Sequence, residues 1–247
     1  MIEGVAEIRD AYRDDGVAST YIDQRFRQPL GALLHQRQAA VLRHVIADCR
    51  PDSVLEIAPG PVRLTIEIVS SLRKPPVVID ASPQMLAQAK HRLAEHGASA
   101  AMIEGDAFRL PFRSAFDLVY TFRLIRHFDE EDRIRLYRQI ASTLRPGGLL
   151  VFDAVNDIVS RRVRARAAAH EYQHYDALVT PDGLAKELSQ GGFAIRALVG
   201  VQHRYPLLQK VQTLIAPRSP SVARGMLEVI DRSGGEPLEW VVVCHRA

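Results

Sequence analysis

Residues 54–65, VLEIAPGPVRLT, combine a short apolar run, an acid and a tight turn around Gly60. Before this stretch, residues 1–50 carry apolar positions at helical spacing, which predicts an N-terminal helical cover. After it, short β-rich runs alternate with helical stretches, an order typical of a parallel sheet with helices on both faces. Ligands bind such sheets at the carboxyl ends of the strands, so the turn marks a candidate binding site.

The same alternation predicts where the other elements lie. We expect strands at residues 53–57, 76–80, 100–104, 116–122, 148–154, 193–201 and 238–245, and helices at 129–144, 160–170, 180–192 and 204–215. Thr180 is the expected N-cap of the third of these helices, with Pro181 as its first helical residue. Pro61 is likewise expected to begin the helix after the Gly60 turn.

The length of 247 residues and an average composition, 47% hydrophobic and 25% charged, predict a single domain over residues 1–247. We divide it into the cover at 1–50, a core at 51–155, and two further covers at 156–180 and 203–236. There is no apolar run long enough for a membrane span and no signal peptide, so a cytoplasmic protein is expected. The net charge of +3 does not suggest nucleic acid as a partner.

Acids follow three successive predicted strands. Asp80 ends the second strand, where a carboxylate can accept hydrogen bonds from both hydroxyls of a ribose. Asp106 follows the third strand and suits an exocyclic adenine amine. Together with Glu56 at the end of the first strand, they predict an adenosine-type ligand.

These stretches resemble the successive motifs of class I S-adenosylmethionine-dependent methyltransferases. The resemblance covers roughly residues 50–155: VLEIAPGPVRLT, then VVIDASPQML at 77–86, EGDAFRLPF at 104–112, FDLVYTFRLIRHF at 116–128 and TLRPGGLLVFD at 143–153. It implies a Rossmann-like, seven-stranded, mostly parallel α/β sheet with the last strand antiparallel and helices on both faces. S-adenosyl-L-methionine is the implied cofactor. The family's G-x-G-x-G appears here as Ala58, Gly60 and Val62.

The resemblance also implies roles for single residues. Glu56 would organise the turn and the methionine amino group, Gly60 would pack beneath the cofactor, and Asp80 would hold its ribose. Met85 would lie near the adenine. The remaining implied cofactor-binding residues are Ala58, Ala81, Asp106, Ala107 and Thr121.

Acceptor residues of the family usually follow the fourth strand. His127 has the intrinsic pKa of a general base, although a histidine there is also often a cap or a packing residue. Arg123 and Arg126 could bind an anionic acceptor or face solvent. By analogy Tyr21 and Arg25 would close over the methionine end, and Tyr172 and Tyr175 would line the acceptor pocket, with packing as the other interpretation.

Two cysteines, Cys49 and Cys244, lack metal-ligand spacing, and His170 with His174 has no third ligand in a recognisable pattern, so no metal site is expected. A nicotinamide dehydrogenase is set aside because G-x-G-x-x-G is absent. Two functions remain: methyl transfer to a small-molecule acceptor at oxygen, nitrogen or carbon, or a catalytically inactive methyltransferase-like binding protein or partner subunit. A homodimer is compatible with either. Residues 205–215 could touch a membrane surface, but core capping explains them more simply.

Overall fold

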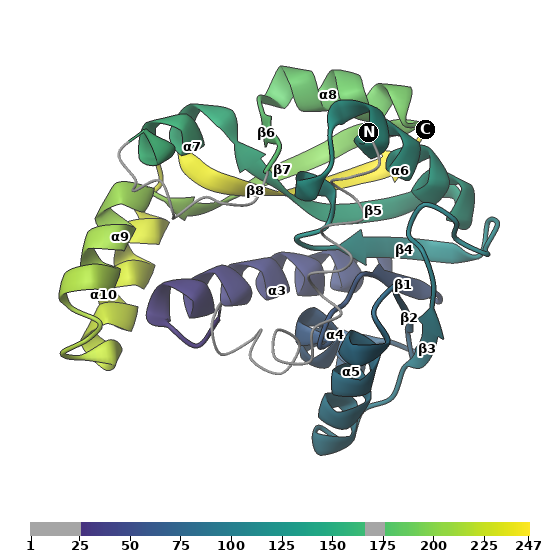
Figure 1. The fold of residues 1–247 in the computed structure, drawn as a ribbon, viewed down its shortest axis with the longest axis horizontal. Coiled ribbons are helices and arrows are strands. Elements are labelled where there is room, and N and C mark those ends of the chain that lie inside the picture. Colours follow the sequence, from purple (N-terminus) through teal and green to yellow (C-terminus); the bar gives the residue numbers. More distant parts are fainter. Residues whose placement is uncertain (1–25, 166–175) are drawn as a thin grey trace.

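The computed structural model describes residues 26–165 and 176–247, in which a central sheet is covered by helices on both faces (Figure 1). The strand order is β3-β2-β1-β4-β5-β8-β7, and β6 pairs with β5 off this path. The strands are β1 Val54–Ile57, β2 Val77–Asp80, β3 Ala101–Glu104, β4 Phe116–Thr121, β5 Leu144–Asn156, β6 Leu178–Val179, β7 Phe193–His203 and β8 Pro237–Arg246.

The sheet confirms the expected fold class, including the antiparallel last strand, since β8 runs antiparallel to both β5 and β7. All seven expected strands are present within one to four residues of the expected bounds. The eighth strand, β6, was not expected. It consists of two residues that pair in parallel with Val155 and Asn156 at the far end of the long strand β5.

Helices cover the two faces of this sheet. They are α3 Pro29–Cys49, α4 Arg63–Ile68, α5 Pro83–Glu95, α6 Glu130–Thr143, α7 Asp157–Arg164, α8 Pro181–Gln190, α9 Tyr205–Leu214 and α10 Pro220–Arg232, with short 3-10 turns η1 Val69–Ser71 and η2 Ile125–His127. None of the helices in the described ranges is long and apolar enough to cross a membrane.

Alternation along the central strand β4 divides the core between the two faces. Leu118 and Tyr120 pack with residues of α3 in one apolar cluster, whereas Val119 packs with residues of α6 and α8 in another. All three side chains are buried, as expected for a central parallel strand covered on both sides. Figure 1 shows α3 on one side of the sheet and α6 with α8 on the other.

Local signals set most helix starts. Thr180 caps α8 as expected, with its hydroxyl accepting the Gly183 N–H over 3.2 Å. Ser82 caps α5 in the same way, accepting the Met85 N–H over 3.2 Å. The expectation for Pro61 was wrong: α4 begins two residues later, because Val62 has a φ of 51° and lies outside the helical region.

The chain between β7 and β8 forms two helices, α9 and α10, where a helical insertion was expected. The pair packs on α3 through a separate apolar cluster that includes Leu33, Leu208 and Leu227. Because β7 and β5 are both antiparallel to β8, β7 runs in the direction of the parallel strands. The α9–α10 pair therefore follows β7 at the edge of the sheet where the parallel strands end.

Candidate functional site

A pocket opens at the carboxyl ends of β1, β2, β3 and β4, and encloses about 1130 Å³ including its open mouth. It contains three acids, from the ends of β1 and β2 and from the loop after β3, within a largely apolar wall. The lining residues are Glu56, Ile57, Ala58, Pro59, Gly60, Arg63, Leu64, Ile79, Asp80, Ala81, Ser82, Met85, Gly105, Asp106, Ala107, Phe108, Phe122, Arg123, Leu124, His127 and Phe128.

The turn after β1 has a left-handed backbone at three alternate residues. Ala58 and Val62 have φ of 51° and Gly60 has φ of 52°. Glycine adopts this region freely, whereas a residue with a Cβ atom does so at a cost of about 1–2 kcal/mol. A Cβ at Gly60 would lie 3.8 Å from the sulfur of Met85, inside the pocket wall. The conformation explains why glycine is typical of these positions, and two of the three carry side chains here.

Asp80 holds this turn against the start of α5. Its carboxylate accepts the Gly60 N–H over 3.1 Å and the Ser82 N–H over 2.9 Å. The side chain is nearly buried, and burial raises its pKa although these backbone donors favour the charged form. Asp80 therefore both organises the turn and presents a carboxylate to the pocket.

Glu56 lies in the pocket wall and accepts hydrogen bonds from the hydroxyls of Thr65 and Tyr120. Complete burial raises the pKa of Glu56 to about 7, against the opposing effect of these two donors and of the nearby Arg63 charge. A carboxyl group poised near neutrality would be stabilised as the anion by a ligand cation.

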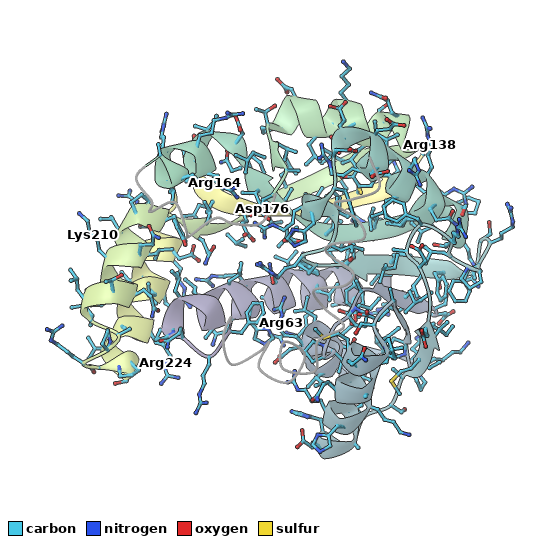
Figure 2. All side chains as sticks on the ribbon, viewed as in Figure 1. Arg63, Arg138, Arg164, Asp176, Lys210 and Arg224 are labelled. Carbon is cyan, nitrogen blue, oxygen red and sulfur yellow. The ribbon has the colours of Figure 1, made fainter. Side chains whose placement is uncertain are left out.

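Arg63 joins the pocket to helix α3 and was missed from the sequence. Its guanidinium donates to His35 Nδ1 and to Gln38 Oε1, each over 2.7 Å, and lies 4.0 Å from the ring centroid of Phe26. Burial and then the Arg63 charge lower the pKa of His35, despite its contact with Glu67. Figure 2 shows Arg63 between α3 and the α4 region. No sequence pattern connects residue 63 with 35 and 38, which belong to another helix.

The loop after β3 supplies the third acid. Asp106 accepts the Phe108 N–H over 2.9 Å, which forms a local turn whose two residues both line the pocket. Phe108 packs edge-on against Phe128 with ring centroids 5.0 Å apart, and both rings line the pocket. This wall offers an apolar surface beside a hydrogen-bond acceptor.

The segment after β4 forms the opposite wall with Arg123 and His127. Arg123 has a φ of 63°, and its N–H donates to Asp153 Oδ1 over 2.6 Å. Its side-chain Nε is buried and has no hydrogen-bond partner among the described residues. His127 Nδ1 lies 3.7 Å from Asp176 Oδ1. The wall thus presents a guanidinium and an imidazole to the pocket.

Behind this wall lies a buried ion cluster centred on Arg126. Its guanidinium contacts Asp153 at 3.1 Å, Asp176 at 3.0 Å and Glu239 at 2.9 Å. Burial opposes the charge of Arg126, but the three carboxylates outweigh it and raise its pKa. Burial would raise the pKa of Asp176, yet its value is lowered, with Arg126 as the main cause, followed by His127 and Arg164. Figure 2 shows Asp176 near Arg164, its second arginine partner at 2.7 Å.

The expected site residues separate into three groups. Ten of them line the pocket: Glu56, Ala58, Gly60, Asp80, Ala81, Met85, Asp106, Ala107, Arg123 and His127. Thr121 and Arg126 are buried behind the wall and do not line it, so Arg126 is a centre of charge pairing and not an anion-binding residue of the pocket. Tyr21, Arg25, Tyr172, Tyr175, His170 and His174 lie outside the described residues.

Besides Arg63, sequence reasoning missed the apolar wall that includes Leu64, Phe108, Phe122, Leu124 and Phe128. Their position just after a strand or a turn was the available signal. An apolar residue there is more often part of the core, and only the fold shows that these side chains border a pocket.

Comparison with known proteins agrees with this geometry. Residues 54–148 match a family described as "Methyltransferase domain". No curated protein matches the chain. Among solved structures, magnesium protoporphyrin IX methyltransferase from Synechocystis with bound SAH is 13% identical, with a TM-score of 0.69, and the similarity covers 98% of this chain and 99% of that one.

Two further structures share the fold. An S-adenosylmethionine-dependent methyltransferase from Clostridium acetobutylicum is 13% identical over 86% of this chain and 92% of that one, with a TM-score of 0.63. The [4+2]-cyclase SpnF is 18% identical over 83% of this chain and 79% of that one, with a TM-score of 0.57. Residues 54–148 therefore match a methyltransferase domain, and the sheet order together with these similar structures shows that the chain has the class I, Rossmann-like methyltransferase fold.

Proposed function

We propose that this protein binds S-adenosyl-L-methionine in the pocket and transfers its methyl group to a small-molecule acceptor. One observation carries the proposal. Acids associated with three adjacent strands, Glu56, Asp80 and Asp106, meet in a single pocket around the left-handed turn at Gly60. This is the arrangement in which a doubly wound sheet binds an adenosine ligand at its strand ends.

The lining residues fit each part of this cofactor. Asp80 is placed to accept hydrogen bonds from ribose hydroxyls, and Asp106 beside Ala107 offers an acceptor to the adenine amine. Met85 and Phe108 supply apolar surface for the adenine ring. Ionised Glu56 suits the methionine ammonium, and Arg63 suits the carboxylate. Gly60 lets the backbone approach closely, because it has no Cβ to occupy the pocket wall.

When bound, the sulfonium would supply an electrophilic methyl group that passes in line to an aligned nucleophile while S-adenosylhomocysteine leaves as the thioether, so the chain's own residues must align the acceptor and remove the proton of a hydroxyl. Arg123 favours an acceptor that carries an anionic oxygen, because this guanidinium side chain lines the pocket and its buried Nε has no hydrogen-bond partner among the described residues. We therefore infer an acidic hydroxyl or carboxylate compound as the acceptor class.

His127 is the proposed general base where the acceptor is a hydroxyl, whereas a carboxylate acceptor is already ionised and needs none. It lines the pocket, and Asp176 Oδ1 lies 3.7 Å from its Nδ1, so the carboxylate would stabilise the imidazolium that forms when His127 takes a proton. The neighbouring Arg126 and Arg164 keep Asp176 ionised. Asp176 would therefore be a positioning residue, and His127 the group that takes the acceptor proton.

A binding protein without turnover is the second candidate function. It is favoured by the strained Ala58 and Val62 in the cofactor turn, which could weaken cofactor binding. The presence of a [4+2]-cyclase among the structures of similar fold also shows that this fold carries chemistry other than methylation.

Calorimetric titration with S-adenosylmethionine and S-adenosylhomocysteine tests the proposal, using wild type, Asp80→Ala and Glu104→Ala. Glu104 is a matched control, because it is paired with Asp80 in the sheet register but is exposed and does not line the pocket. Binding that is lost only in Asp80→Ala supports the cofactor site. Methylation in a screen of phenols and carboxylic acids then separates the enzyme from the binding protein. Failure of wild type to bind either nucleoside contradicts methyl transfer and favours the partner subunit.

A further inference from the structure

The α9–α10 pair carries most of the exposed large hydrophobic residues of the described chain. Of the eight large hydrophobic residues that are exposed in residues 26–165 and 176–247, five lie on these two helices. Val229, Leu214 and Val222 are the most exposed of all, at 71%, 58% and 54%. We call these five residues the hairpin patch: Leu207, Leu214, Val222, Met226 and Val229.

Helical spacing places the patch on the outer side of the pair. Val222, Met226 and Val229 are separated by four and three residues and form one stripe along α10, and Leu207 and Leu214 are aligned in the same way along α9. The contacts with α3 come from other sides of the helices. Gln212 accepts the Leu30 N–H over 2.9 Å and Asp231 pairs with Arg37 at 2.6 Å, each about 140° or more around its helix from the stripe.

Positive charge is concentrated on the same segment. Residues 204–232 contain five basic and two acidic residues, and their net charge of +3 equals that of the whole chain, so the rest of the chain is neutral overall. Both acids are engaged, Asp231 with Arg37 and His203, and Glu228 with Arg232. Among the described residues, Lys210, Arg218 and Arg224 make no ion pair. Figure 2 shows Lys210 and Arg224 at the periphery, on the helices.

The position of the pair relates this surface to the pocket. It follows β7 at the sheet edge where the pocket opens, and α10 packs against α3. Helix α3 in turn holds the pocket residue Arg63 through His35 and Gln38. The hairpin patch therefore lies on the side of the molecule at which the parallel strands end, and the pocket opens on this side too.

We propose that the hairpin patch docks this protein onto the surface of an anionic lipid bilayer. Exposed apolar side chains with neighbouring cations, here Lys210 and Arg218 beside Leu207 and Leu214, are the chemistry that binds the boundary between headgroups and acyl chains. Cations near an anionic surface add attraction to lipid phosphates. A second copy of the chain fits less well, because a symmetric contact through the patch would bring two sets of Lys210 and Arg218 together. This inference does not depend on the proposed methyl transfer.

Vesicle flotation tests the proposal, using the full chain with phosphatidylcholine vesicles and with vesicles that also contain phosphatidylglycerol. The test variant is Met226→Gln with Val229→Gln, because glutamine keeps the helix propensity of these exposed positions. A second variant, Lys210→Gln with Arg218→Gln, removes the charge beside Leu207 and Leu214 alone. Met102→Gln is the matched control, since Met102 is 36% exposed on β3, and β3 is at the other end of the strand order from β7.

We expect wild type and Met102→Gln to float with the anionic vesicles and not with the neutral ones. The apolar variant should bind at least about tenfold more weakly, from the loss of two inserted side chains. The charge variant should bind more weakly at low salt and approach wild type as salt screens the attraction. Absence of wild-type binding, or equal binding by the apolar variant, would overturn the proposal. A dimer in sedimentation that this variant abolishes would identify a second copy as the occupant instead.

Discussion

Ala58 and Val62 share a φ of 51° on either side of Gly60, so the backbone of the cofactor turn is left-handed at every second residue. Val62 is fully buried and packs with Val78, Ala89 and Leu93, which offsets the strain at that position. Ala58 is only partly buried and has little packing to lose. A glycine would therefore relieve strain at both positions, but it would remove packing mainly at position 62.

Ala58→Gly should raise the free energy of unfolding by about 1 kcal/mol. Glycine relieves the left-handed strain in the folded state, and this gain exceeds the stability lost because glycine adds conformational entropy to the unfolded chain. Chemical denaturation measures the change. Ala89→Gly is the matched control in helix α5, where the same substitution should destabilise the protein by about 1 kcal/mol or more. Equal signs for the two variants would contradict the strain at Ala58.

Arg126→Ala should lower the free energy of unfolding by about 3–5 kcal/mol, because it leaves Asp153 and Glu239 buried without their cation. Denaturant titration monitored by tryptophan fluorescence is suitable, since Trp240 adjoins Glu239 in β8. Arg161→Ala removes the exposed pair with Asp157 and should change stability by about 1 kcal/mol at most. A small effect of Arg126→Ala would show that the cluster is not desolvated.

Glu56→Gln should change how stability depends on pH. The folded-state pKa of Glu56 is about 7, above its ordinary value of 4.5, so between these values the folded protein binds more protons than the unfolded chain. The contribution of Glu56 to stability is therefore fully present below pH 4.5 and is lost as the pH rises through 7. In the glutamine variant this loss disappears, while the side-chain oxygen still accepts from Thr65 and Tyr120.

The difference in unfolding free energy between Glu56→Gln and wild type should thus grow by roughly 3 kcal/mol from pH about 4 to about 8. Melting curves of both proteins across this range measure it. Asp106→Asn is the control, since Asp106 also lines the pocket but is only partly buried. A difference that is independent of pH would show that Glu56 keeps an ordinary pKa.

His127→Gln should lower kcat by about 10²–10⁴-fold with an acceptor hydroxyl, because the proposed base is removed. Affinity for S-adenosylhomocysteine, measured by calorimetry, should change little. Asp176→Asn should give a smaller loss of kcat and a changed pH profile, since it alters the orientation and charge beside His127. If both variants retain the wild-type kcat and pH profile, His127 is not the base.

Local patterns were sufficient to predict most secondary structure. The runs that became β1, β2 and β4 are short and β-branched, and Thr180 with Pro181 forms a capping signal that depends only on neighbours in the chain. The start of α4 was predicted wrongly for a reason outside this pattern. Pro61 suits a first helical position, but the left-handed Val62 that follows it delays the helix to Arg63.

The sequence by itself determined the sheet and the acids at the site, because strand periodicity places Glu56, Asp80 and Asp106 at or just after the ends of parallel strands that meet along one edge. Only the tertiary structure decided which charges meet. Arg126 pairs with Glu239, 113 positions away, and does not line the pocket. Arg63 does line the pocket, where it donates to Gln38 of α3. Packing between elements that are distant in the sequence brings these charged residues together, and the spacing of residues along the chain does not predict such contacts.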